Sequence, residues 1–187
     1  SAFVQALRDL IVQLLSESDA RQSQWQVKIL EAVGNNGQVL IEVVPELERL
    51  IGKQPPALEL SGTAQQNRFN LLFLKFIEVF TTPQHPLVIF LDDLQWADSA
   101  SLQLIKLLMG GKGYLLLLGA YRDNEVQAAH PFMLTVEELK KTNAIVNTIT
   151  LAPLIFQDIN RLVAETLNCS TELSQPLAEL VQRKTQG

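Results

Sequence analysis

The stretch PLVIFLDDLQWAD, residues 86–98, decides the fold, because within it an apolar run ends abruptly at two adjacent carboxylates. Residues 86–91 carry no polar side chain. This predicts a parallel strand buried on both faces, since a strand buried on one face would alternate. Asp92 and Asp93 then follow the carboxyl end of the strand, where α/β proteins place their ligands. A buried carboxylate without a partner is costly, so a cation or a hydrogen-bonded water is expected nearby.

The acid pair fits two interpretations. In a Walker B element the first acid, here Asp92, holds Mg²⁺, and the second, here Asp93, orients or activates a water. In a purely structural turn the two carboxylates instead cap backbone N–H groups.

A second buried strand is predicted at residues 114–121. Between the two strands, residues 99–109 place apolar side chains at helical spacing, with Asp98 or Ser99 as the N-cap, and a Gly-Gly-Lys-Gly turn follows. A strand–helix–strand connection of this length predicts a parallel βαβ unit, in which both strands end at the same edge of the sheet.

This topology brings Arg122, which follows the second strand, beside Asp92 and Asp93 if the two strands are neighbours. A guanidinium and two carboxylates at one sheet edge suit a phosphate with its metal, because Arg offers planar donors to phosphate oxygens while the acids hold the cation. The alternative is a structural ion pair between Arg122 and an acid such as Asp93, Asp123 or Glu125.

These segments resemble the ATPase domain of the STAND class of P-loop NTPases, relatives of the AAA-type ATPases. The resemblance lies in LVIFLDDLQWAD (87–98), LLLLGAYRDNEV (115–126) and TLAPL (150–154), and it extends over nearly the whole chain. It is strongest to the version in large bacterial signalling proteins that join a serine/threonine protein kinase domain, this ATPase, a GAF sensor and a histidine kinase.

The resemblance implies ATP and Mg²⁺ as cofactors. It gives Asp92 the role of the Mg²⁺-linked acid and Asp93 that of the second Walker B acid. Arg122 corresponds to the sensor 1 residue, which can reach the terminal phosphate.

The phosphate-binding loop G-x-x-x-x-G-K-[ST], or Walker A, does not occur in the sequence. Gly52-Lys53 and Gly111-Lys112 lack both the first glycine and the hydroxyl residue, and they predict turns. We therefore expect the chain to be a fragment whose parent carries the phosphate loop upstream of Ser1.

The composition excludes several classes of function. The longest apolar runs are far shorter than a bilayer span, so no membrane span is expected. The net charge of −5 leaves no basic surface for direct nucleic-acid binding. Cys169 is the single cysteine, which favours a reduced, cytoplasmic setting. Two histidines, each beside a proline, give no basis for a zinc site or a histidine-centred catalytic dyad.

The predicted fold class is α/β: an incomplete doubly wound parallel sheet of the P-loop NTPase core, followed by part of a helical lid. Its three parallel strands are residues 86–91, 114–121 and 145–151. Residues 1–152 form the partial core and residues 153–187 the start of the lid. Without the strand that bears the phosphate loop, the sheet would have a gap, so poor stability or self-association of the isolated piece is expected.

The predicted function is an ATP-binding and ATP-hydrolysing switch domain of a bacterial signal-transduction protein kinase. Its partners would be ATP or ADP and the neighbouring kinase and sensor domains, and ATPase activity is expected of the intact parent but not of this fragment alone. The alternatives are a non-catalytic scaffold or interaction module with a degenerate ATPase fold, or the ATPase module of a transcriptional regulator or cyclase.

Overall fold

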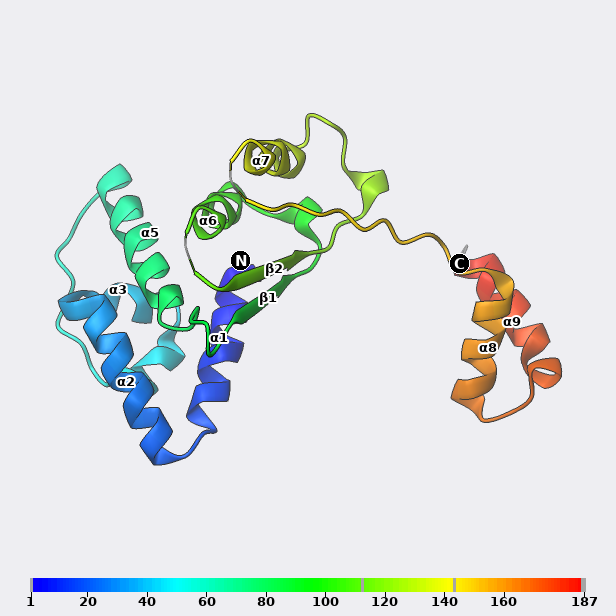
Figure 1. The fold of residues 1–187 in the computed structure, drawn as a ribbon, viewed down its shortest axis with the longest axis horizontal. Coiled ribbons are helices and arrows are strands. Elements are labelled where there is room, and N and C mark those ends of the chain that lie inside the picture. The colour runs from blue at the N-terminus through cyan, green and yellow to red at the C-terminus, as the bar shows by residue number, and fades with distance from the viewer. Residues whose placement is uncertain (1, 112, 143, 186–187) are drawn as a thin grey trace. The chain divides into compact units, whose positions relative to one another are not determined.

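The computed structural model describes residues 2–111, 113–142 and 144–185, and the chain divides into two compact units. The first unit is Ser1–Val146 and the second is Asn147–Gly187. In Figure 1 the first unit contains the sheet with helices α1 to α7, and the second contains helices α8 and α9.

A parallel two-stranded sheet lies in the first unit. Its strands are β1 (Leu87–Leu91) and β2 (Leu115–Gly119), and Leu91 pairs in register with Gly119. Helix α6 (Ser99–Met109) connects the strands. The predicted βαβ unit is therefore confirmed, and both strands end at the same edge of the sheet.

The prediction that the first strand is buried on both faces is wrong. Ile89 and Leu91 are buried, whereas Val88 and Phe90 are 56% and 60% exposed, and their register partners on β2 are exposed as well. Successive side chains of a strand point to opposite faces. Within the first unit the Ile89 face is therefore buried, whereas the Val88 face is largely exposed.

The predicted helix at residues 99–109 is present as α6, and further helices surround it in the first unit. The long ones besides α6 are α1 (Ala2–Leu15), α2 (Asp19–Val33), α5 (Gly62–Glu78) and α7 (Pro131–Lys140). The short helices and 3-10 turns are α3 (Gly37–Ile41), α4 (Glu48–Ile51), η1 (Gly34–Asn36), η2 (Pro45–Leu47), η3 (Leu94–Trp96) and η4 (Asp123–Glu125). Among the described residues, none of the helices has both the length and the apolar character that crossing a membrane requires.

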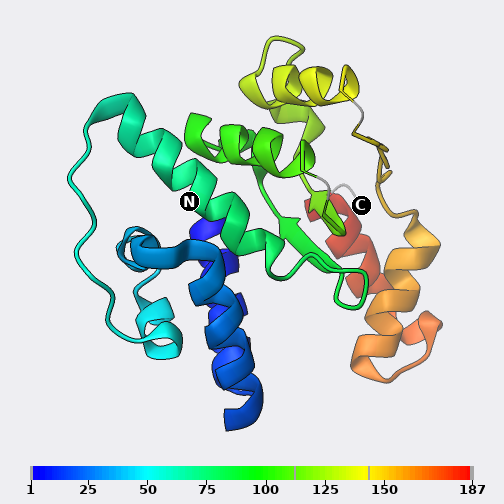
Figure 2. The same ribbon diagram turned by 60° about the vertical axis from the view of Figure 1, so that its left-hand side comes forward.

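The core of this unit is built on the apolar face of α5. Phe73 is fully buried, and the ring of Phe3 in α1 meets it edge-on at 5.8 Å between centroids. Helix α6 packs beside α5 on one side and α7 on the other (Figure 2). Phe73 and Phe76 of α5 are therefore core residues, on the one apolar face that their helical spacing creates.

Pro45 and Gly52 set where the short helical segments between residues 37 and 51 restart and end. α3 ends at Ile41, and the chain restarts as a 3-10 turn with Pro45 at its first position, where a missing N–H costs nothing. Gly52 then ends α4 with a φ of 73°, which confirms the turn predicted there. The other predicted turn includes Lys112, which lies outside the described residues.

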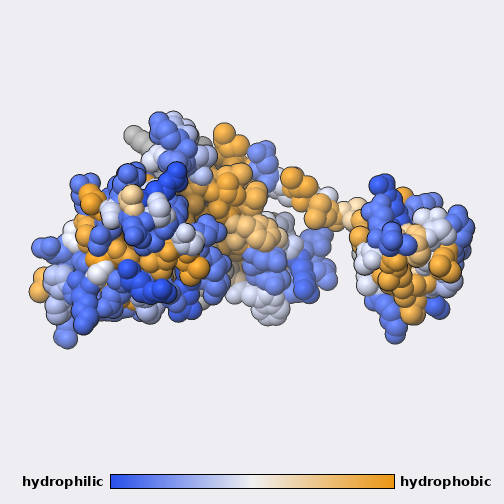
Figure 3. Space-filling view, turned by 90° about the horizontal axis from the view of Figure 1, so that it is seen from below, coloured by the Kyte–Doolittle hydropathy of each residue, from blue (hydrophilic) through white to orange (hydrophobic). Residues whose placement is uncertain are grey.

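The second unit is a helical hairpin of α8 (Phe156–Leu167) and α9 (Thr171–Thr185). Ala178 is buried between the helices, and the Ser174 hydroxyl donates to Asn160 Oδ1 at 2.6 Å. Apolar side chains remain at the surface of both units (Figure 3). In the hairpin the exposed ones are Leu162, Leu167, Leu173, Leu177 and Leu180.

The predicted third strand, residues 145–151, does not form. The chain from 144 to 155 has no regular secondary structure, and Ile145, Ile149 and Leu151 are each more than 80% exposed. A strand needs a neighbour for its backbone groups, and the sheet of the described residues consists of β1 and β2 alone. Along the chain, the boundary between the two compact units falls in this segment, between Val146 and Asn147. The core–lid boundary at residue 152 stays a prediction.

Candidate functional site

The candidate site lies where the loops after β1 and β2 are joined by backbone hydrogen bonds. The N–H of Ala120 donates to the carbonyl of Leu91 at 2.9 Å, and the N–H of Leu94 donates to the carbonyl of Ala120 at 3.0 Å. The parallel pairing is thus extended beyond the strands, and it brings Asp92 and Asp93 into the same loop layer as Arg122.

Asp93 turns the chain sharply after the strand. It lies in the left-handed region, with φ 53° and ψ 43°, a conformation that Asp tolerates better than most residues. The 3-10 turn η3 follows at once, closed by the N–H of Trp96 donating to the Asp93 carbonyl at 2.9 Å. This backbone conformation sets the direction of the Asp93 Cα–Cβ bond relative to the strand.

Two other carboxylates of the loop bind backbone N–H groups. Asp92 Oδ1 accepts from the N–H of Asp93 at 2.8 Å. Asp98 Oδ1 accepts from the N–H of Ser101 at 2.7 Å and so forms the predicted N-cap of α6. That hydrogen bond lowers the pKa of Asp98 below its ordinary value. The capping interpretation of the acid pair therefore applies to one oxygen of Asp92.

Gln95 links the two loops with its side-chain amide. Its Nε2 donates to Asp93 Oδ1 at 2.8 Å, and its Oε1 accepts from the backbone N–H of Arg122 at 3.3 Å. The residue is 7% exposed. Both ends of a buried amide are therefore satisfied within the site.

Arg122 lies beside Asp93, as the topology predicted, and makes two ion pairs. Its Nε is 3.9 Å from Asp93 Oδ1 and its Nη1 is 3.3 Å from Glu125 Oε1. The Arg122 side chain is 66% exposed. These pairs match the structural alternative, but an exposed guanidinium held by such pairs can also exchange partners at little cost.

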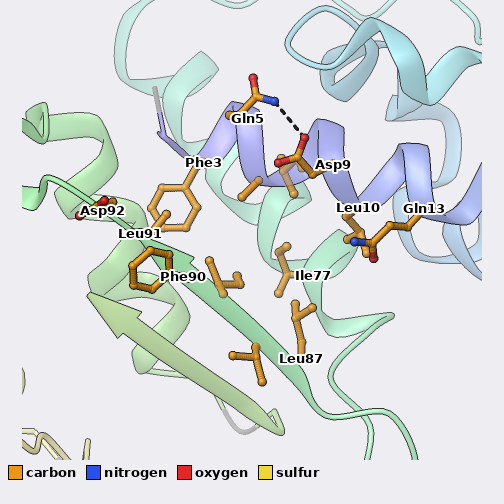
Figure 4. Close-up of a pocket in the computed structure, with 14 residues that line it drawn as sticks. Phe3, Gln5, Asp9, Leu10, Gln13, Ile77, Leu87, Phe90, Leu91 and Asp92 are labelled. Atoms are coloured by element: carbon orange, nitrogen blue, oxygen red, sulfur yellow. Dashed lines mark hydrogen bonds between the residues drawn. The ribbon is translucent and has the colours of Figure 1, made fainter. Parts of the chain in front are cut away.

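Two hollows adjoin the acid pair. One, of about 230 Å³, is lined by Asp92, Asp93 and Asp98 together with Trp96, which is 75% exposed. The other is a groove of about 460 Å³ between α1 and β1. Figure 4 shows Phe3, Phe90 and Asp92 at one end of this groove and Leu87, Leu10 and Gln13 at the other.

The donor set of the site fits Mg²⁺ only with help from a ligand. Within the described residues there is no group of three or more His, Cys, Asp or Glu side chains that could hold a metal ion. Mg²⁺ is however commonly bound by one or two carboxylates together with phosphate oxygens and waters. Asp92 could supply one such ligand, since its Oδ2 accepts no hydrogen bond from the part of the chain that the structure describes.

The structure thus brings together Asp93 and Arg122, with Asp92 adjacent in the same loop. Sequence reasoning missed Gln95. The sequence shows one feature that could have pointed to it: a single amide between two large apolar residues, Leu94 and Trp96, shortly after the acid pair. That signal does not distinguish a buried connector from a surface glutamine.

Comparisons with known proteins give one family and two relatives. The family described as AAA ATPase domain matches residues 1–118. Hybrid signal transduction histidine kinase G of Dictyostelium discoideum is 29% identical over 252 residues, which cover 100% of this chain and 7% of that protein. Histidine protein kinase 1 of Candida albicans is 25% identical over 115 residues, which cover 54% of this chain and 5% of that protein.

The chain spans less than a tenth of the length of these two curated relatives. No solved structure matches it. The family match covers more than half of the residues and includes β1, the acid pair and most of β2. The chain therefore belongs to the AAA ATPase domain family.

Proposed function

We propose that this chain contributes the Walker B and sensor 1 elements of an ATP-dependent switch domain in a signal-transduction kinase. The observation that carries the proposal is the placement of Asp93 and Arg122, whose Oδ1 and Nε atoms are 3.9 Å apart at the carboxyl edge of a parallel sheet. Two kinds of similarity support it: the AAA ATPase family match and two relatives named as histidine kinases.

Each residue has a distinct role in this proposal. Asp92 supplies a carboxylate oxygen toward Mg²⁺. Asp93 accepts a hydrogen bond from the attacking water and orients it. Arg122 gives up its exposed pairs with Asp93 and Glu125 and donates to the terminal phosphate. Bound Mg²⁺ would offset charge on the phosphates, which the protein's two carboxylates cannot do.

The loop that holds the phosphates is not in this sequence, so the proposal places it elsewhere in the intact protein. The nucleotide state would then bias the output of neighbouring kinase and sensor domains. A piece without the loop is not expected to bind ATP by itself, because the loop's backbone N–H groups supply most phosphate contacts.

The test measures ATP turnover and nucleotide binding in the intact protein. Asp93→Asn should lower kcat by about 100-fold or more while sparing binding, because it removes the group that orients water. Asp92→Asn should weaken Mg²⁺-dependent binding. Asp158→Asn is the matched control, since it removes an exposed carboxylate in the second unit. Equal turnover in wild type and Asp93→Asn would remove Asp93 from the mechanism.

Arg122→Ala separates a phosphate sensor from a structural residue. A sensor contacts a group that only ATP carries, so its loss should reduce the preference for ATP over ADP by tenfold or more, equivalent to about 1.5–3 kcal/mol. Calorimetric titration with both nucleotides measures this ratio. Arg161→Ala, which removes an exposed i,i+4 ion pair in α8, is the control.

The second candidate function is a scaffold with a degenerate ATPase fold. The ion pairs of Arg122 with Asp93 and Glu125 favour it, since they satisfy the guanidinium without any ligand. In that case Arg122→Ala lowers the melting temperature and leaves the ATP/ADP ratio unchanged.

A further inference from the structure

We propose that Gln95 is a positioning residue, whose side-chain amide orients the Asp93 carboxylate and ties it to the main chain of Arg122. The inference rests on the proposed function, because it assigns a part in ATP hydrolysis to a residue that does not itself touch the nucleotide. It starts from two hydrogen bonds of one buried side chain, Nε2 to Asp93 Oδ1 at 2.8 Å and Oε1 from Arg122 N–H at 3.3 Å.

The chemistry of the two contacts requires an amide. Asp93 offers an acceptor and the Arg122 main chain offers a donor, so the linking side chain needs one donor and one acceptor at its tip. The reversed orientation of the amide would place two donors together at Arg122 and two acceptors together at Asp93, so these partners fix which way Gln95 points. A glutamate at the same place would put a second carboxylate against Asp93.

The hydrogen bond from Gln95 controls how Asp93 faces Arg122. Asp93 Oδ1 accepts a hydrogen bond from Gln95 Nε2 at 2.8 Å and lies 3.9 Å from Arg122 Nε. The shorter contact holds the carboxylate in place while the longer one remains easy to break. Oδ2 of Asp93 accepts no hydrogen bond from the described residues and is the oxygen left for water.

Gln95 also couples the two loops mechanically. Asp93 is a left-handed residue in the loop after β1, whereas Arg122 belongs to the loop after β2. Because Gln95 is 7% exposed, its two hydrogen bonds face little competition from water. A shift of the Arg122 main chain toward a phosphate would therefore be transmitted to the Asp93 carboxylate.

The test compares Gln95→Glu and Gln95→Leu with wild type in the intact protein. Both should lower kcat for ATP by about 10–100-fold, the usual cost of losing a group that orients a reacting side chain, with KM changed less than about twofold. Gln95→Glu keeps the acceptor for Arg122 N–H but loses the donor to Asp93. Lowering the pH should restore part of its kcat, because a protonated carboxyl regains the donor. Gln95→Leu should show no such recovery.

Gln22→Glu is the matched control. Gln22 also uses a partly buried amide, which donates to the carbonyls of Leu15 and Glu17, but it lies in α2, outside the loops that carry the acid pair and Arg122. It should leave kcat and its pH profile unchanged. A melting curve for each variant shows whether a loss of activity reflects unfolding, and the pH-dependent recovery of Gln95→Glu supports positioning even if Gln95→Leu does not fold.

The outcomes separate the two proposals. Suppose that the wild type turns over ATP. If the kcat of Gln95→Glu is then unchanged, or is lowered and not restored at acid pH, the role of Gln95 is overturned and the proposed function stands. A wild type without ATP turnover overturns the proposed function, and the role of Gln95 with it.

Discussion

The loops after β1 and β2 belong to one site but are held in different ways. The first is fixed by buried side chains, a left-handed backbone residue and carboxylates that bind N–H groups. The second presents Arg122, whose side chain is 66% exposed and is held by two ion pairs, with Asp93 and Glu125. The comparison indicates a site with a fixed acid and an adjustable cation, which suits a group that must respond to a ligand.

The largest effect should come from Leu94, because it anchors the first loop in the core at 3% exposure. Leu94→Ala should lower the free energy of unfolding by about 2–5 kcal/mol, through lost burial and the cavity left behind. Val126→Ala, at the partly buried end of the second loop, should cost about 1 kcal/mol. Urea unfolding measures both, and equal losses would contradict the contrast between the loops.

Gly119 sharpens the comparison, because it shows how closely the first loop packs on β2. A Cβ added at Gly119 would lie 2.5 Å from Leu94 Cδ1. Gly119→Val should therefore cost about 1–3 kcal/mol by overpacking. Combined with Leu94→Ala, which removes the obstructing atom, the cost should be less than the sum of the two single changes. Strict additivity in urea unfolding would show that the two residues do not interact.

Asp98 tests whether the hydrogen bonds of the first loop contribute to stability. Asp98→Ala should lower the free energy of unfolding by about 1 kcal/mol by removing the N-cap of α6, whereas Asp98→Asn should be nearly neutral at pH 7.

The pH dependence of this effect follows from the lowered pKa of Asp98. A carboxyl whose pKa falls on folding stabilises the protein above its unfolded pKa, here near 3.8, and loses that contribution as the pH falls through the folded value. The difference between wild type and Asp98→Asn should therefore be constant from pH 7 to about 5 and change only in acid. A difference that varied around neutral pH would point to another titrating group.

The smallest effect is expected in the second loop. Glu125→Gln removes one exposed ion pair of Arg122, and such pairs contribute about 0–1 kcal/mol. The melting temperature should change little, and the change should shrink further at high salt. A large, salt-independent loss would mean that Arg122 is as firmly fixed as the acid.

Periodicity predicted α6 and the βαβ unit, because apolar spacing and caps are local signals. Asp98, Pro45 and Gly52 act within a few residues of where they stand. Burial of the sheet is a non-local property, so the same apolar run could not reveal that Val88 and Phe90 stay exposed. Nor could β-branched residues at 145–151 form a strand without a neighbour to pair with.

For the site, topology placed Arg122 beside Asp93, because parallel strands must end at one edge. Gln95 could not be found in this way, since its role depends on side-chain hydrogen bonds between loops 27 residues apart. Which groups Gln95 can reach depends on the geometry of the turn, here set by the left-handed Asp93, and the sequence does not predict that conformation.

The exposed indole of Trp96 gives the site an optical reporter. The chain has two tryptophans, and the ring of the other, Trp25, packs against Phe80 with 5.2 Å between ring centroids. Trp25→Phe would leave Trp96 as the single tryptophan, 75% exposed and beside three carboxylates, which excitation at the red edge of the absorption band selects over the two tyrosines. Its emission should be red-shifted and strongly quenched by acrylamide, a neutral quencher that the acidic surroundings do not repel. Occupation of the hollow would shield the ring, so a change in quenching would register a ligand without any label.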